Sequence, residues 1–129
     1  MRAVRARDTG PEIAVRRLLH RLGYRFRLHR ADLPGHPDLA FPARRAAVFV
    51  HGCFWHGHDC PRGARAPKTN AAYWAAKIAR NRARDAETRA ALEARGWRAA
   101  VVWECALRDP AAVAAALAAF LGPPGAAPR

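Results

Sequence analysis

Hydrophobic residues recur at helical spacing in three stretches of the chain, and each stretch predicts a helix. The first runs over 9–23, with Thr9 as its N-cap and a glycine at its end. The second is long, over 70–95, with Asn70 as its cap, and the third is an alanine-rich helix over 110–122. The residues between these helices are therefore expected to form strands and loops.

Four stretches outside the helices have the pattern of β-strands. Residues 24–28 alternate apolar with basic side chains, which is typical of a half-buried strand, and a short strand is expected over 38–41. Residues 46–50 and 97–103 are mostly apolar and predict further strands of the same sheet. The order helix, three strands, helix, strand, helix predicts an α/β fold with a mixed central β-sheet flanked by helices.

The length of the chain, 129 residues, is that of one domain with its own core. We expect this single domain to span 1–122 and residues 123–129 to form a disordered tail. No apolar run approaches the roughly 20 residues of a membrane span, and the first residues lack the apolar core of a signal peptide. A cytoplasmic protein without a membrane partner is therefore expected.

Positive charge dominates the sequence, with a formal net charge of +13. A balance of this size favours a polyanion such as nucleic acid as the partner, because self-repulsion otherwise opposes compaction. Almost all of the charge is arginine, since Lys68 and Lys77 are the only lysines. Arginine suits forked contacts to phosphate, but a GC-rich genome would favour arginine without any such function.

Three cysteines and a histidine form a candidate metal site. Cys53, His58 and Cys60 are spaced as C-x4-H-x-C, and Cys105 follows the last predicted strand. If that strand lies beside the strand ending at Val50, the four side chains can meet. Four such ligands suit tetrahedral Zn2+, and a site without an open position is structural rather than catalytic. The alternative is a set of buried free cysteines with exposed histidines.

Two acidic residues are candidates for hydrolytic chemistry. Asp38 begins a predicted strand directly after Pro37, which is expected to hold the residue before it extended. Glu12 follows Thr9 at capping-box spacing, so it is also explained as part of a helix start. Phosphodiester hydrolysis needs carboxylates for Mg2+, a group that moves a proton, and positive charge on the phosphates. Asp38, His56 and the arginines offer these three parts.

Five stretches of the sequence together resemble one known family. They are "MRAVRARDTGPE", "LPGHPD", "VFVHGCFWHGHDC", "YWAAKIARNRARD" and "GWRAAVVWECAL", in order over nearly the whole chain. They resemble the very short patch repair (Vsr) endonucleases, which are bacterial DNA mismatch endonucleases. The resemblance implies a restriction-endonuclease-like core of the PD-(D/E)xK type with a structural zinc site. The stretch "VFVH" lacks the usual acid-x-Lys pair, so a histidine would replace the lysine.

The same resemblance implies a Mg2+-dependent endonuclease that nicks double-stranded DNA 5' of the thymine in T:G mismatches. Such mismatches arise when 5-methylcytosine deaminates, and the nick would start very short patch repair. By this resemblance Asp38 binds the Mg2+ and His56 assists proton transfer, while Glu12 and His51 match further active-site residues. The residues that match the structural zinc ligands are Cys53, His58, Cys60 and Cys105.

Three aromatic residues also acquire a role from the resemblance. Phe54, Trp55 and Trp74 match positions whose side chains enter the base stack beside the mismatch, where unstacking is cheap. The alternative for Phe54 and Trp55 is packing over the zinc, and for Trp74 it is the buried stripe of the long helix.

The partners that the resemblance implies are double-stranded DNA with a T:G mismatch and mismatch-repair proteins such as MutL. It also implies a monomer that is associated with the nucleoid in the bacterial cytoplasm. Two other functions stay open. One is a zinc-stabilised DNA-binding module without catalysis, which would have no reason to retain both Asp38 and His56. The other is a restriction-type nuclease without mismatch preference, which the paired aromatics argue against.

Overall fold

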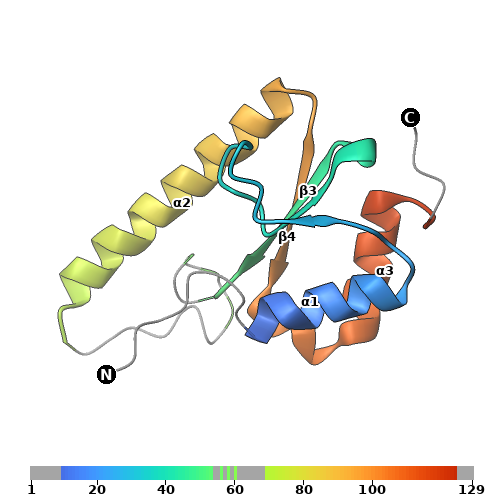
Figure 1. Ribbon diagram of the computed structural model, residues 1–129. Helices are drawn as coiled ribbons and strands as arrows, with labels where there is room; N and C mark the ends of the chain where they lie inside the picture. The colour runs from blue at the N-terminus through green and yellow to red at the C-terminus, as the bar shows by residue number, and fades with distance from the viewer. Residues whose placement is uncertain (1–9, 54–55, 57, 59, 61–68, 125–129) are drawn as a thin grey trace.

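A computed structural model describes residues 10–53, 56, 58, 60 and 69–124 of the chain. Its elements follow one another in the predicted order, with two short 3-10 helices added (Figure 1). The elements are α1 (Gly10–Arg21), β1 (Arg27–Leu28), β2 (Leu39–Phe41), η1 (Pro42–Arg44), β3 (Ala46–His51), α2 (Ala71–Ala94), β4 (Arg98–Trp103), η2 (Glu104–Arg108) and α3 (Pro110–Leu121).

The strands form one mixed sheet in the order β1-β2-β3-β4. The first three strands are antiparallel neighbours, and β3 pairs with β4 in parallel after the crossover through α2. In this register His51 lies opposite Trp103, so the carboxyl ends of β3 and β4 meet. The predicted mixed sheet is confirmed, and so is the expectation that the last strand lies beside the strand ending near Val50.

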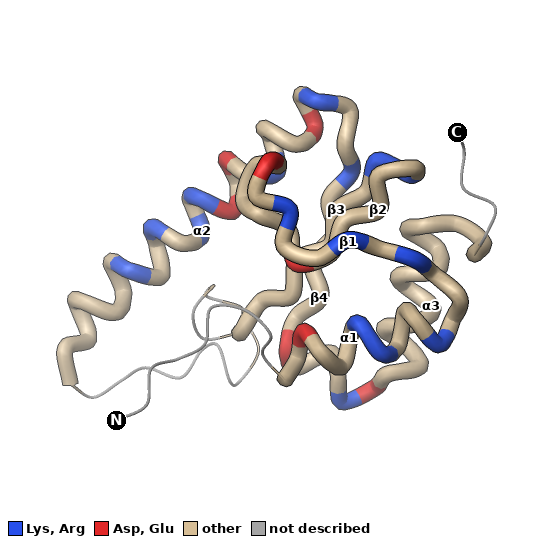
Figure 2. The backbone as a smooth tube through the Cα atoms, viewed as in Figure 1, with Lys and Arg blue, Asp and Glu red and all other residues tan. Residues whose placement is uncertain are grey.

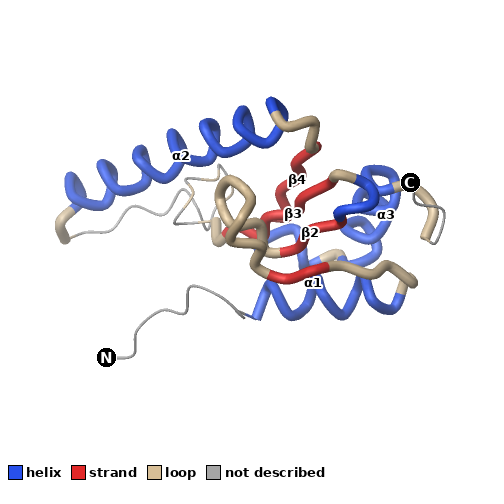
Figure 3. Tube along the Cα trace, turned by 45° about the horizontal axis from the view of Figure 1, so that its top comes forward, coloured by secondary structure: helices blue, strands red, loops and turns tan. Residues whose placement is uncertain are grey.

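Helices cover both faces of the sheet, as Figure 3 shows from the side. On one face, α1 and α3 pack over a core that includes Leu19, Val48 and Leu117. On the other face, Leu92 of α2 packs against a smaller cluster that includes Ala47. Because successive side chains of a strand point to opposite faces, β3 contributes to both cores and is buried between the two layers.

The first strand is much shorter than predicted, since only Arg27 and Leu28 of the expected 24–28 pair with β2. Tyr24 is instead fully buried, and its hydroxyl donates a hydrogen bond to the carbonyl of Gly122 at the end of α3. The alternating pattern of these residues therefore reflects packing between α1 and α3 as well as strand pairing.

The ends of the two later helices are fixed in different ways. Asn70 stands at the N-cap position of α2, but it is left-handed (φ 57°) and makes no side-chain capping bond among the described residues. Asp109 does cap α3, because its side chain accepts from the N–H of Ala112 at 3.2 Å. Past α3, the Pro123 carbonyl accepts from Arg44 Nη2 at 2.9 Å, and residues 125–129 lie outside the described part.

No helix in the part of the chain that the structure describes combines the length and apolar character needed to cross a membrane.

Candidate active site and metal centre

A cleft of about 1000 Å³ opens where α1, the 33–38 loop, β3, α2 and β4 come together. Its walls include the predicted site residues Glu12, Asp38, His51 and His56, and also Asp85 from α2. The fold thus brings together all four residues that were predicted to take part in catalysis, from three separate stretches of sequence.

Asp38 is anchored to the neighbouring strand. Its Oδ2 accepts a hydrogen bond from the backbone N–H of Val50 in β3 at 2.7 Å. Burial raises the pKa of the Asp38 carboxyl to about 7, although the Val50 N–H acts in the opposite direction. The nearby Glu12 carboxyl raises this pKa further. The Asp38 carboxyl group is therefore partly protonated near neutral pH.

The turn before Asp38 differs from the expectation. Gly35 (φ +75°) and His36 (φ +48°) are both left-handed, so the prediction that Pro37 keeps the residue before it extended is wrong. The His36 N–H donates to the Leu33 carbonyl at 3.1 Å, which closes a tight turn. A Cβ at Gly35 would overlap the methyl group of Thr88 in α2, so this turn lies directly against the helix.

Glu12 faces the interior from the first turn of α1 and is only 3% exposed. Its Oε2 lies 3.1 Å from His29 Nε2 and 3.3 Å from Arg16 Nη2. Ligand atoms of Glu12, His29 and Asp38 all lie within 4.8 Å of one another. Glu12 therefore belongs to the cleft, and Thr9, its partner in the alternative capping box, lies outside the described residues.

His51 and His56 stack face to face, with ring centroids 3.7 Å apart and an interplanar angle of 4°. His56 Nδ1 lies 2.7 Å from Asp85 Oδ2, whereas His51 Nδ1 lies 3.9 Å from the same oxygen. Because a carboxylate accepts, the short contact assigns the hydrogen of His56 to Nδ1 and leaves Nε2 for a substrate. Asp85 thus orients His56 from the middle of α2.

His51 is a buried, neutral neighbour of this pair. Burial lowers the pKa of His51 to about 4, with a smaller contribution from His56. Its approach to Asp85 is therefore not an ion pair at neutral pH, and within the described residues its buried Nδ1 has no hydrogen-bond partner.

Asp85 was not among the predicted site residues. It closes the stretch "YWAAKIARNRARD", in which the family resemblance gave a role to Trp74 alone. The sequence held no local signal for Asp85, because its place in the site depends on its contact with His56, 29 residues away along the chain.

The four predicted metal ligands meet at the carboxyl ends of β3 and β4. Ligand atoms of Cys53, His58, Cys60 and Cys105 all lie within 4.8 Å of one another. Cys105 Sγ is 3.6 Å from His58 Nδ1, and sulfur and nitrogen ligands of one tetrahedral zinc ion are separated by about 3.6 Å. Burial raises the pKa of the Cys53 thiol to about 11. The donor set and spacing fit one closed tetrahedral site.

Trp103, the last residue of β4, joins this cluster to the histidine pair. Its ring stacks on His58, with centroids 4.2 Å apart and an interplanar angle of 18°, and meets His51 edge-on at 5.2 Å. The Trp103 side chain therefore contacts both the cysteine cluster and the histidines of the cleft, so a shift of the cluster would displace the ring that packs against His51.

The predicted aromatic wedge is described only in part. Phe54 and Trp55 lie outside the described residues. Trp74 lies in the first turn of α2, partly buried, with its ring 5.0 Å from that of Tyr73, which is 54% exposed. This end of α2 reaches well beyond the sheet (Figure 1). Trp74 thus has an exposed aromatic neighbour, Tyr73, which was not among the predicted wedge residues.

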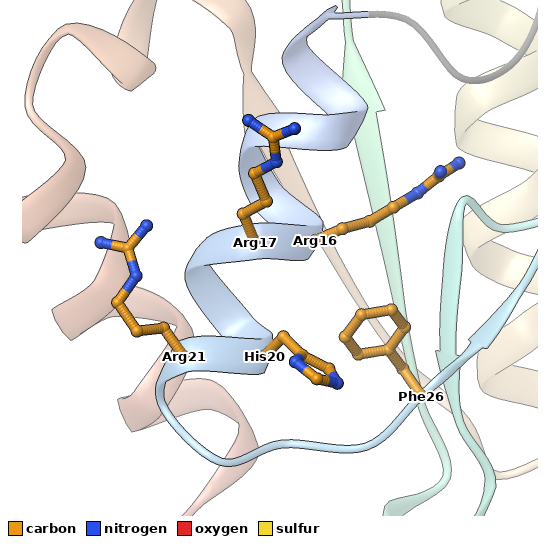
Figure 4. Close-up of a pocket in the computed structure, with 5 residues that line it drawn as sticks. All are labelled: Arg16, Arg17, His20, Arg21 and Phe26. Carbon is orange, nitrogen blue, oxygen red and sulfur yellow. The ribbon is translucent and has the colours of Figure 1, made fainter.

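Lysine and arginine residues are spread along several elements of the fold, including α1 and α2 (Figure 2). Lys77, Arg84 and Arg89 of α2 line the cleft itself. A second, shallower hollow of about 510 Å³ lies along α1 and includes Arg17 and Arg21 (Figure 4). Figure 4 shows these two arginines extending away from the helix, while His20 lies against Phe26.

Comparison with known proteins gives one consistent family. Residues 1–62 match the family model described as "DNA mismatch endonuclease Vsr". The chain is 58% identical to the type II nicking enzyme V.XorIIP of Xanthomonas oryzae over 95% of this chain and 90% of the relative. It is 39% identical to the type II nicking enzyme V.NmeAIP of Neisseria meningitidis, over 86% and 79% of the two chains.

A third relative is the DNA mismatch endonuclease Vsr of Escherichia coli, which is 44% identical over 84% of this chain and 69% of its own length. The chain belongs to the Vsr family of DNA mismatch endonucleases.

Proposed function

We propose that this protein is a DNA endonuclease that nicks one strand of a duplex 5' of the thymine in a T:G mismatch. The observation that carries the proposal is the cleft, in which a pair of carboxyl groups and a histidine–aspartate pair face the same space. The names of the relatives, which are mismatch endonucleases and nicking enzymes, support the same reaction class.

The carboxyl pair would hold the catalytic Mg2+. Asp38 and Glu12 offer hard oxygen ligands that lie close together at the edge of the cleft, which is the ligand chemistry that Mg2+ prefers. Burial, with a further contribution from Glu12, raises the pKa of Asp38, and a bound cation would favour the ionised form of this carboxyl group. When bound, Mg2+ supplies positive charge to the phosphate oxygens and lowers the pKa of bound water.

His56 would move the proton during hydrolysis. Asp85 holds its Nδ1–H, so Nε2 is free to take a proton as the oxygen of water attacks phosphorus, or to give one to the departing oxygen. The neutral His51 stacks on one face of the His56 ring and limits the rotation of that ring. Asp85 and His51 are thus proposed to position His56 rather than to react themselves.

Substrate binding would use the basic side chains and the aromatics. Lys77 and Arg89 at the cleft, with Arg17 and Arg21 along α1, would contact phosphates on both sides of the cut. Trp74 is proposed to meet the weakened base stack at the mismatch, together with Phe54 and Trp55.

The cysteine cluster is proposed to bind one structural Zn2+. Its four ligands leave no open position for water, so the ion would stabilise the ends of β3 and β4 without taking part in hydrolysis. The family relationship extends the proposal to a restriction-endonuclease-like core, a monomer in the bacterial cytoplasm near the nucleoid, and MutL as a partner.

A nicking assay tests the proposal directly. The protein is incubated with Mg2+ and end-labelled duplexes that carry T:G, another mismatch or no mismatch, and the cut strand is mapped. We expect a single nick 5' of the thymine in the T:G duplex alone. Equal cutting of all duplexes would indicate a nuclease without mismatch preference, and binding without any cut would indicate a DNA-binding module.

A further inference from the structure

The Glu12 carboxylate is held by two side chains that the proposed reaction does not use. Arg16 Nη2 and His29 Nε2 lie 3.3 Å and 3.1 Å from the same oxygen, Oε2. All three side chains are largely enclosed, with exposed fractions of 4% for Glu12, 18% for Arg16 and 13% for His29. Contacts made in such an enclosed place are less screened by water than those at the surface.

Only one arrangement of hydrogens is consistent with these contacts. Arginine can only donate and a carboxylate can only accept. Arg16 Nη2 also lies 3.3 Å from His29 Nε2, but if that nitrogen accepted from Arg16, its lone pair would face the Glu12 oxygen. His29 Nε2 therefore carries a hydrogen and donates it to Glu12. Arg16 and His29 are two donors on one acceptor.

His29 also touches the second carboxyl residue through its backbone. It directly follows β1, and its N–H donates to the Asp38 carbonyl at 3.4 Å. Its φ of +48° is unusual for a residue other than glycine and persists only where the surroundings fix it. One residue thus contacts Asp38 with its main chain and Glu12 with its side chain.

We propose that His29 is a positioning residue, which holds the Glu12 carboxylate beside Asp38 so that both acids face the same divalent cation. This inference rests on the proposed function, because it assigns the cation to the Asp38–Glu12 pair. Residues that orient metal ligands through hydrogen bonds typically change metal affinity about 10- to 100-fold when they are replaced. Without the His29 donor, Glu12 keeps its charge but loses one of the two side chains that hold its Oε2.

The test compares two amide side chains that differ by one methylene group. His29→Gln can place an N–H near the position of Nε2, whereas His29→Asn is too short to reach Glu12. Asparagine also tolerates a left-handed backbone, so that variant should fold. Binding of Mn2+, used as the probe cation, is measured by calorimetry on the full chain with its zinc content and melting temperature checked first.

We expect His29→Asn to weaken Mn2+ binding about tenfold and His29→Gln to restore most of it. His20→Asn, a matched change of an exposed histidine on α1, should leave Mn2+ affinity unchanged. In a Glu12→Gln background, His29→Asn should have no further effect, because the group that it positions is gone.

Two results would overturn the inference: Mn2+ affinity of His29→Asn equal to that of the unmodified chain, or the same tenfold loss in the Glu12→Gln background. The second result stays informative even if the His29→Gln variant does not fold. A wild-type chain that neither binds Mn2+ nor nicks a T:G duplex would instead overturn the proposed function.

Discussion

The carboxyl groups of Asp38 and Glu12 lie side by side in a mostly enclosed place. Protonation of one of them removes the repulsion between their negative charges. A divalent cation would relieve it better, since it neutralises both groups at once. The protein therefore holds an arrangement that opposes its own stability at neutral pH and favours cation binding. Such local costs are common where binding or catalysis requires them.

The raised pKa of Asp38 predicts how stability depends on pH. Its folded pKa, about 7, exceeds the value near 4 of an unfolded chain, so the folded state holds a proton that the unfolded state has lost. This contribution to stability is complete below about pH 4 and is lost as the pH rises through 7. In buffer without Mg2+, the Asp38→Asn variant should therefore not show the part of the loss in stability with rising pH that the Asp38 carboxyl group causes.

Thermal melting at several pH values measures the effect. At pH 8 we expect the Asp38→Asn variant to melt at least about 4 °C higher than the unmodified chain, corresponding to roughly 1 kcal/mol or more. Near pH 4 the two should differ little. A variant that melts lower at every pH would contradict the burial of an unfavourable carboxylate at this position.

Asp85 offers a second prediction at the scale of single residues. Asp85→Asn keeps the size of the side chain but replaces the acceptor charge next to His56 Nδ1, so His56 would lose its fixed tautomer. We expect the nicking rate to fall about 100-fold with binding of T:G duplexes little changed. Glu87→Gln, at an exposed position on the same helix, is the matched control and should nick normally.

The residues predicted to take part in catalysis were easier to find from the sequence than two of the residues that contact them. Asp38 and His56 were candidates for their chemistry, and His51 followed from the family resemblance, which also gave each of these residues its expected role. Asp85 and His29 act through contacts with residues far away in sequence, and these depend on how α2 and β1 pack. A single sequence has no local signal for such pairings.

At the scale of elements, the site depends on two strands that end together. β3 and β4 are parallel neighbours, so their carboxyl ends deliver the histidines and the cysteine cluster to one edge of the sheet. This adjacency could be predicted from the helical crossover between the strands. The shortness of β1 could not, because Tyr24 is drawn into a tertiary contact with the end of α3.

The turn at Gly35 predicts a sharp effect of one methyl group. Gly35→Ala would strain a left-handed residue and push against Thr88 of α2, where the turn and helix form one wall of the cleft. We expect the free energy of unfolding to fall by about 1–3 kcal/mol, as measured by urea denaturation. Gly10→Ala adds a methyl group into open space and should change stability little.

The cysteine cluster predicts a link between metal content and folding. Cys105→Ser removes one of the four proposed ligands, which would connect η2 to the end of β3. Because metal binding contributes directly to folding free energy, we expect zinc content to drop below one equivalent and the melting temperature to fall by about 10 °C or more. Unchanged zinc content, measured by atomic absorption, would remove Cys105 from the ligand set.

At the scale of the whole molecule, charge sets how the protein meets its substrate. The net charge of +13 was evident from the sequence, but its distribution was not. Arginines lie along both α1 and α2 (Figure 2), and Arg84 and Arg89 of α2 line the cleft, so a duplex at the cleft would meet positive charge around its acidic residues.

This distribution predicts a strong salt dependence of DNA affinity. Removing two phosphate contacts by Arg17→Gln and Arg21→Gln should reduce the slope of log affinity against log salt by about 2. Arg30→Gln is the control, because Arg30 is already paired with Asp32 at 2.6 Å and should alter the slope little. A flat salt response of the unmodified chain would contradict phosphate-dominated binding.

The length of α2 has a consequence for how recognition and cutting are kept in step. Trp74 and Asp85 lie on one uninterrupted helix, and a rise of 1.5 Å per residue separates them by about 17 Å along its axis. A single inserted residue would add about 1.5 Å and turn one of them by about 100° relative to the other. The helix would therefore fix both the distance between the mismatch contact proposed for Trp74 and the cleavage site next to Asp85, and the relative orientation of these two residues.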